Sequence, residues 1–93
     1  MIDFTSGIVV LTFTSDGCVP CRLQKPILAQ AEAELNGFAA FHLINIAEQP
    51  ELAVRYGVMN IPATVVLKDG KEHWRSIGLT EKDEIVGAVR GAL

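Results

Sequence analysis

Apolar residues are grouped in short runs along this chain, and the spacing within each run predicts a strand or a helix. The first run extends from Gly7 to Phe13 and is almost continuous in β-branched and other large apolar residues. This pattern is typical of a central strand that is buried on both faces. Ser15-Asp16-Gly17 ends the run, and we expect the chain to turn there.

The segment from Val19 to Leu35 has apolar residues at helical spacing. Its apolar positions are Leu23, Ile27, Leu28, Ala31 and Leu35. Its polar positions include Gln24, Lys25, Gln30, Glu32 and Glu34. The two sets alternate with the period of an α-helix, so the segment is predicted to be amphipathic, with the apolar stripe facing a core. Asn36-Gly37 is expected to end this helix.

The rest of the chain predicts five more elements. They are a strand over 38–46, a short helix over 50–56, strands over 63–68 and 71–77, and a helix after Thr80. Asp69-Gly70 between the last two strands is a strong signal for a two-residue hairpin turn. Thr80 with Asp83 resembles a capping box, and the apolar stripe of the last helix is predicted at Ile85, Val86, Val89 and Leu93. This order predicts an α/β fold with a mixed sheet and helices on both faces.

Length and composition fit one small domain. The chain has 93 residues, of which 49% are hydrophobic, and this is enough for a single core of sheet and helices. The net charge is −3 and no basic cluster is present. Because binding to phosphates needs a patch of Lys and Arg, we expect no nucleic-acid partner. The prediction is a single domain over residues 1–93.

The first residues do not resemble a signal or a membrane anchor. Residues 1–6 contain an early acid and no basic flank. The apolar run that follows is far shorter than the roughly 18 residues that a membrane-spanning helix needs. We therefore expect a soluble protein of the cytoplasm that does not interact with membranes.

The two cysteines of the chain, Cys18 and Cys21, lie between the first predicted strand and the first predicted helix. The strand brings Cys18 to the start of the helix, where unpaired backbone amides and the positive end of the helix dipole favour an anion. A thiol in this position ionises more readily than a free cysteine. Cys21 follows one helical turn later and can approach closely enough to close a small disulfide. The pair is therefore predicted to exchange electrons.

The cysteine pair has two alternative interpretations, a structural disulfide and a metal site. A disulfide across two intervening residues constrains almost no chain entropy, so it would be a poor structural staple. A structural zinc site needs four protein ligands, and only His42 and His73 could join the cysteines, without the paired spacing of zinc ligands. We therefore expect no metal and no cofactor other than the Cys18–Cys21 disulfide itself.

Several short motifs follow one another along the chain at spacings known from one protein family. They are Cys18-Val19-Pro20-Cys21, Pro26 inside the helix, Asn45-Ile46 with Pro50, Ile61-Pro62 before the Asp-Gly hairpin, and Gly78. Together they resemble the thioredoxin family, whose Cys-Gly-Pro-Cys is similar to residues 18–21. The likeness runs from about Gly7 to the end of the chain. It implies a thioredoxin-like fold with a four-stranded mixed sheet and three flanking helices, in which the family's N-terminal strand and helix are reduced or absent.

This resemblance implies an enzyme that reduces protein disulfides. Cys18 would attack a substrate sulfur to form a mixed disulfide, and Cys21 would then attack Cys18 and release the reduced product. The residues that the resemblance assigns to substrate binding are Gly17, Val19, Pro20, Ile61, Pro62 and Gly78. The Ile61–Pro62 bond is expected to be cis. The implied partners are disulfide-containing proteins and an electron donor similar to thioredoxin reductase, and the implied state is a monomer.

Three positions depart from the family's pattern. Thr12 stands where thioredoxins keep a buried aspartate, Leu43 where they keep its partner lysine, and Gly17 where they keep a tryptophan. The loss of both the acid and the base is physically consistent, because a protein that kept only one of the two charges in its interior would be destabilised. The departures predict altered proton handling and a narrower or different set of partners.

Two alternative functions remain open at this point. One is a glutaredoxin-like reductase coupled to glutathione, although glutaredoxins more often carry proline directly after the first cysteine, and here Pro20 precedes the second. The other is a binding module without catalysis, in which Gly17 marks a lost docking surface. A labile thiol pair has no use in a scaffold and argues against the module. We expect His42 to be a solvated strand residue and Trp74 to serve in packing.

Overall fold

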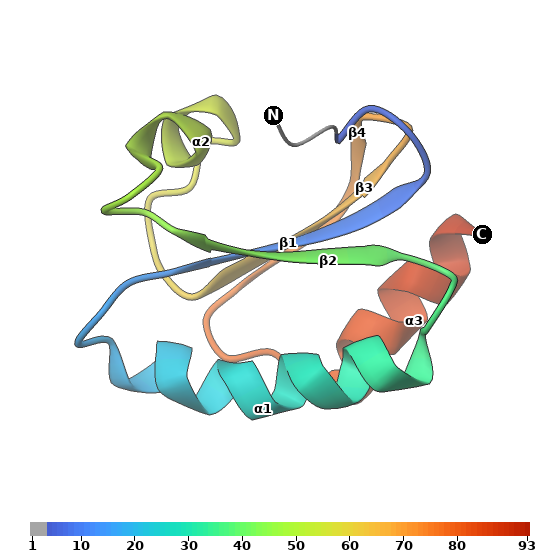
Figure 1. Cartoon of the computed structure of the whole chain (residues 1–93), viewed down its shortest axis with the longest axis horizontal. Helices are drawn as coiled ribbons and strands as arrows, with labels where there is room; N and C mark the ends of the chain where they lie inside the picture. Colours follow the sequence, from blue (N-terminus) through green and yellow to red (C-terminus); the bar gives the residue numbers. More distant parts are fainter. Residues whose placement is uncertain (1–3) are drawn as a thin grey trace.

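The computed structural model describes residues 4–93, so the prediction that rests on residues 1–3 lies outside the described residues. Its elements are β1 (Ile8–Thr14), α1 (Val19–Glu34), β2 (Ala40–Asn45), α2 (Pro50–Arg55), β3 (Ala63–Lys68), β4 (Lys71–Ile77) and α3 (Lys82–Ala92) (Figure 1). The predicted order of strands and helices is confirmed. The strand predicted over 38–46 is shorter at both ends.

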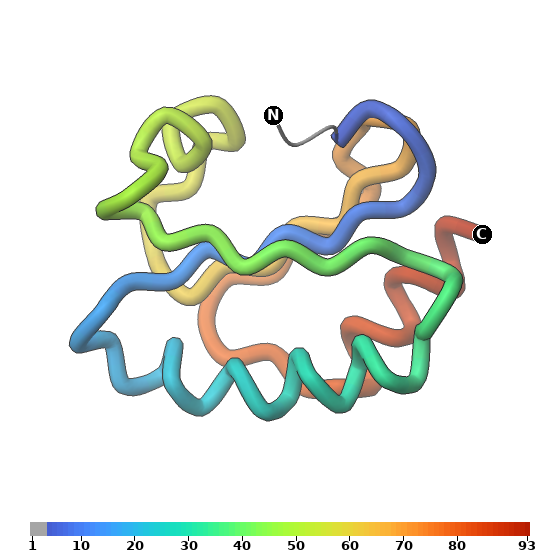
Figure 2. Tube along the Cα trace, viewed as in Figure 1, coloured from blue at the N-terminus to red at the C-terminus, as the bar shows by residue number. Residues whose placement is uncertain are grey.

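The four strands form one mixed sheet in the order β2-β1-β3-β4. β1 is parallel to β2 and antiparallel to β3, and β3 is antiparallel to β4 (Figure 2). Phe13 near the end of β1 is opposite Ala63 at the start of β3, and Ala63 is opposite Ile77 at the end of β4. The segments after β1, before β3 and after β4 therefore meet at the same end of the sheet.

Helices cover both faces of the sheet, as predicted. α1 and α3 pack together on one face, and α2 lies on the other (Figure 1). The buried residues on the α1 and α3 side are Val10, Ala31, Leu35, Val66, Ile85, Val86 and Val89. Those on the α2 side are Phe4, Val9, Leu11, Phe13, Ile44, Ala63, Val65 and Leu67. β1 contributes to both clusters, so the prediction of a central strand buried on both faces is confirmed.

The predicted faces of α1 are wrong at two positions. Leu23, which was predicted to be in the apolar stripe, is 55% exposed, and Gln24, which was predicted on a polar face, is 1% exposed. The cause is a contact that helical periodicity does not report: both polar ends of the Gln24 side chain hydrogen-bond the backbone of Thr80. The buried face at the start of α1 is therefore the one that carries Cys21 and Gln24.

Two predictions about α3 are also wrong. Thr80 does not cap the helix, because Glu81 occupies the N-cap position without a side-chain hydrogen bond and the Thr80 hydroxyl contacts Ser76 and Gly78 instead. Leu93 lies past the last helical residue and is 64% exposed, whereas Ala92 is buried. Because α3 ends at Ala92, Leu93 does not continue the helical face that packs against the core.

Aromatic side chains and an arginine fix the edges of the sheet. Trp74 on β4 is half-buried and packs against the cluster on the α1 and α3 side, as predicted. His42 on β2 is not simply solvated, because it is half-buried and its ring packs against Phe4 with centroids 5.4 Å apart. The Arg75 guanidinium on β4 donates to the Tyr56 carbonyl after α2 and to Glu72, and the bond to Glu72 raises the pKa of Arg75.

Leu35→Ala should destabilise the protein by about 2–5 kcal/mol, because Leu35 is fully buried and its loss would leave a cavity. Leu93→Ala removes the same atoms from an exposed position and should change the free energy of unfolding by less than about 0.5 kcal/mol. Urea unfolding followed by circular dichroism measures both. Equal effects of the two substitutions would contradict this assignment of the core.

Candidate redox site

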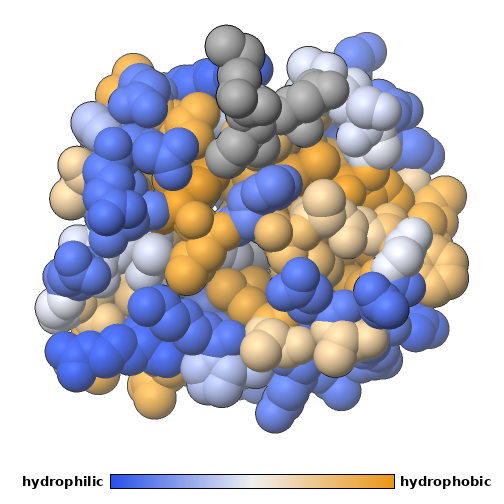
Figure 3. Space-filling view, viewed as in Figure 1, coloured by the Kyte–Doolittle hydropathy of each residue, from blue (hydrophilic) through white to orange (hydrophobic). Residues whose placement is uncertain are grey.

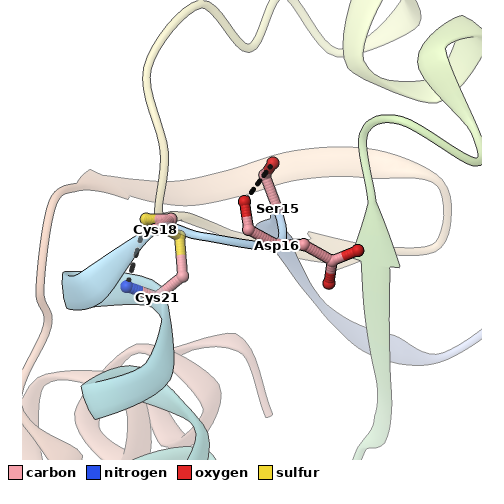
Figure 4. The surroundings of a disulfide bond; sticks show 4 residues. All are labelled: Ser15, Asp16, Cys18 and Cys21. Atoms are coloured by element: carbon pink, nitrogen blue, oxygen red, sulfur yellow. Dashed lines mark hydrogen bonds between the residues drawn. A yellow bond between two sulfur atoms is a disulfide. The ribbon is translucent and has the colours of Figure 1, made fainter.

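Cys18 is the N-cap residue of α1. Its backbone is extended (φ −89°, ψ 111°), and its Sγ accepts a hydrogen bond of 3.2 Å from the backbone N–H of Cys21 (Figure 4). Pro20 follows in the first turn, where a residue without an N–H costs no helical hydrogen bond. The sulfur therefore lies at the positive end of the helix, where negative charge on a thiolate is stabilised.

Cys18 and Cys21 are joined in a disulfide, with their Cα atoms 5.2 Å apart. Cys18 is partly exposed, whereas Cys21 is only 2% exposed. Cys18 is therefore the more accessible residue of the pair. This asymmetry matches the order of attack that a two-step exchange requires.

A tight turn connects β1 to Cys18. The Ser15 hydroxyl donates to the Asp16 carbonyl at 3.3 Å, and the Asp16 carboxylate points away from the disulfide (Figure 4). Gly17 has a φ of +78° and is exposed. Any other residue at this position would be strained, because side chains disfavour this region of backbone space. Gly17 thus shapes the turn that delivers Cys18 to the helix.

The structure brings Pro62 and Gly78 together. The Ile61–Pro62 bond is cis, as predicted, and the carbonyl of the buried Pro62 accepts a hydrogen bond of 2.8 Å from the N–H of Gly78. The strand register places both residues at the end of the sheet where the chain leaves β1 towards Cys18. Of the other predicted binding residues, Gly17, Val19 and Pro20 are exposed and Ile61 is half-buried.

The position of the family's buried acid holds a neutral hydroxyl pair. Thr12 is 1% exposed, and its Oγ1 lies 3.5 Å from Oγ1 of the fully buried Thr64. Leu43 is beside Thr12 in the sheet but is 49% exposed. The expectation that both positions are interior is therefore wrong for Leu43, since β2 is an edge strand. Of the two positions, only position 12 would therefore bury a charged side chain, and threonine avoids that cost because it is neutral.

Two hollows lie beside α1, one along its middle and one at its start. One, of about 250 Å³, lies between α1 and β2. Figure 3 shows apolar residues in the middle of this side of the molecule. Its lining is Thr12, Lys25, Leu28, Ala29, Glu32, Phe41, His42 and Leu43. The other, also of about 250 Å³, is lined by Thr14, Ser15, Asp16, Gly17, Cys21, Arg22 and Lys25. It gives the nearly buried Cys21 a polar opening towards solvent.

The histidines do not complete a metal site with the cysteines. His42 and His73 lie on β2 and β4, the two edges of the sheet. Within residues 4–93, no three side chains of His, Cys, Asp or Glu are grouped as metal ligands would be.

None of the helices in this described part of the chain has the length and apolar character needed to cross a membrane.

One residue near the site was missed by the sequence analysis. Gln24, on the same buried face of α1 as Cys21, binds the loop that contains Gly78. A single glutamine at a polar position of a helix gives no signal of such a contact. Only the tertiary structure, which places α1 beside residue 80, identifies it.

Comparisons with known sequences agree with this geometry. The sequence model of the thioredoxin family matches residues 2–91. Thioredoxin from Chlamydia muridarum is 38% identical over 84 residues, which cover 90% of this chain and 81% of that protein. Thioredoxin from Bacillus subtilis is 33% identical over 83 residues, covering 89% of this chain and 80% of that protein.

Solved structures show the same fold. A mutant thioredoxin from Halobacterium salinarum has a TM-score of 0.83 and 26% identity, over 94% of this chain and 75% of that one. A malaria-parasite thioredoxin-2, described as a component of protein secretion machinery, has a TM-score of 0.89 and 14% identity, over 98% and 88% of the two chains. With a disulfide between Cys18 and Cys21 at the start of α1, this chain is a thiol–disulfide oxidoreductase and belongs to the thioredoxin family.

Proposed function

We propose that the protein reduces disulfide bonds in other proteins, with Cys18 as the nucleophile and Cys21 as the resolving cysteine. The observation that supports these roles best is the difference in exposure between the two cysteines. Cys18 is partly exposed and its Sγ accepts a hydrogen bond from the helix terminus, while Cys21, to which it is bonded, is almost fully buried.

The reaction would proceed in two exchanges. In the reduced protein, the Cys18 thiolate attacks one sulfur of the substrate disulfide, a bond forms to Cys18, and the other substrate sulfur leaves as a thiolate that takes up a proton. Cys21 then loses its proton and attacks Cys18. The mixed disulfide breaks, the second substrate sulfur leaves and is protonated, and the substrate has gained two electrons. The protein is left with the Cys18–Cys21 disulfide.

An apolar rim around the site suits a protein substrate. Large hydrophobic side chains are exposed on the segments that meet at this end of the sheet or lead to it: Val19 (61%), Leu23 (55%), Met59 (92%), Ile77 (51%) and Leu79 (44%). Grouped exposed apolar residues of this kind commonly mark protein-binding surfaces. The substrate chain would lie along the backbone of Ile61 and Gly78, next to Gly17, Val19, Pro20 and Pro62.

Proton transfer at Cys21 would differ from the family's pattern. The Thr12 hydroxyl is not an acid or base at physiological pH, whereas a carboxylate at this position would be. The polar hollow beside Cys21 offers another route, since it opens towards solvent and is lined by polar and charged side chains. We propose that the Cys21 proton leaves to water through this hollow.

The remaining parts of the proposal concern partners and surroundings. The Cys18–Cys21 disulfide must be reduced again after each turnover, and we propose an electron donor similar to thioredoxin reductase for this step. We also propose that the protein uses no cofactor other than its own disulfide. We also propose that residues 1–93 act as one domain and as a monomer, in the reducing environment of the cytoplasm. Glutathione as the donor is the competing outcome of the assay described below.

Cys18→Ser should lower the rate of insulin reduction by dithiothreitol to that of dithiothreitol alone, because the attacking thiolate is lost. Reduced Cys21→Ser, freed of dithiothreitol before insulin is added, should instead accumulate a mixed disulfide with insulin, since the second exchange cannot occur. Turbidity and non-reducing mass spectrometry measure the two results. A mixed disulfide trapped through Cys21 in the Cys18→Ser variant would contradict the assigned roles, and an inactive wild-type protein would favour a binding module.

A coupled assay distinguishes the two electron donors. We expect NADPH oxidation in the presence of insulin and a flavoprotein thioredoxin reductase, and only background oxidation with glutathione and glutathione reductase. The Cys18→Ser variant is the control in both assays, because it retains the fold but not the nucleophile. Turnover with glutathione alone would support the glutaredoxin-like alternative instead.

In the reduced protein, the resonances of Cys21 should titrate with pH without an additional step from a buried carboxylate, because position 12 is a threonine. Thr12→Asp should add such a step, since burial raises the pKa of a carboxyl group. Carbon-13 NMR of labelled cysteine measures both titrations. A strongly shifted acid step in the wild-type protein would show that another carboxylate has taken the role of the family's aspartate.

A further inference from the structure

Gln24 makes an unusual pair of hydrogen bonds for a residue inside a helix. Its side chain is 1% exposed, its Oε1 accepts from the Thr80 N–H at 2.8 Å, and its Nε2 donates to the Thr80 carbonyl at 2.9 Å. The carboxamide therefore pairs with the backbone of a single residue, as a neighbouring strand would. Thr80 lies between β4 and α3, so neither the sheet nor the helix pairs these two backbone groups.

The contacts continue from Thr80 to the predicted substrate-binding residues. The Thr80 hydroxyl lies 2.7 Å from the Ser76 hydroxyl and 3.2 Å from the Gly78 carbonyl. The Gly78 N–H in turn donates to the Pro62 carbonyl at 2.8 Å. A path of hydrogen bonds thus runs from α1, one turn after Cys21, through residues 78–80 to the cis-proline.

An apolar residue would occupy the place of Gln24 without the cost of burying a carboxamide. It would, however, leave the N–H and the carbonyl of Thr80 unpaired in a buried environment, which is among the costlier changes in a folded protein. The Gln24 side chain therefore suits this position because it offers both an acceptor and a donor to the backbone of Thr80. It ties the segment after β4 to the helix that carries both cysteines.

We propose that Gln24 is a positioning residue that holds residues 78–80 against α1 and so fixes the substrate-binding backbone relative to Cys18. This inference rests on the proposed function. To react, a disulfide-bonded peptide has to contact Cys18 and, at the same time, the backbone of Gly78 and Ile61. Its rate of reduction therefore depends on the distance between Cys18 and that backbone. A small disulfide needs only the Cys18 sulfur, so its reaction does not depend on Gln24.

Gln24→Met tests this, because methionine has a similar length and no strong hydrogen-bonding group. Gln30→Met is the matched control, since Gln30 is an exposed residue of the same helix. Stopped-flow fluorescence gives the second-order rate constants of each reduced protein with a disulfide-bonded peptide and with hydroxyethyl disulfide. We expect Gln24→Met to lower the peptide rate about tenfold and the small-disulfide rate by less than about twofold. Gln30→Met should change neither.

Each outcome has one interpretation. An unchanged peptide rate in Gln24→Met, or an equal fall in both rates, would overturn the positioning role while leaving the proposed function intact. A wild-type protein that reduces neither disulfide would instead refute the proposed function. If Gln24→Met does not fold, Thr80→Val removes the hydroxyl contacts and keeps the backbone pair with Gln24, and it should lower only the peptide rate, by about threefold. An unchanged peptide rate in Thr80→Val would then overturn the inference, because Gln24 is proposed to act on Gly78 through these hydroxyl contacts.

Discussion

The hydrogen bond from the Cys21 N–H to the Cys18 sulfur is the interaction on which the site depends. It exists because the chain is extended at Cys18 and helical immediately afterwards, so that the sulfur takes the position of an N-cap acceptor. The same geometry places Cys21 one turn deeper and almost out of contact with solvent. The proposal that Cys18 attacks first rests on this one local feature, which provides the hydrogen bond to its sulfur, the bonding partner Cys21 and the difference in exposure between the two cysteines.

The sheet supplies the rest of the site. β1 is central and buried on both faces, which fixes the point where the chain emerges towards Gly17 and Cys18. Because β3 and β4 run antiparallel in the observed register, the cis-proline before β3 and Gly78 after β4 reach the same end. Residues distant in the sequence are therefore gathered without a large cavity, and the site is an exposed surface around one sulfur.

Much of this arrangement could be predicted from the sequence, because it depends on local signals. The buried run of β1, the Asp69-Gly70 hairpin and the cysteines before a helix each give a pattern that short-range physics explains. Side-chain contacts between distant segments give no such pattern. The burial of Gln24, the contacts of the Thr80 hydroxyl in place of helix capping, and the exposure of Leu43 on an edge strand all follow from packing and required the structure.

The most direct test of the account is the alkylation rate of reduced Cys18 by iodoacetamide as a function of pH, with Cys21→Ser used to isolate the single thiol. Stabilisation of the thiolate at the start of α1 predicts a midpoint at least about one pH unit below the ordinary value of about 8.5 for a free cysteine, and rapid reaction at neutral pH. A midpoint at the ordinary value, or a thiol that does not react at neutral pH, would contradict the central claim.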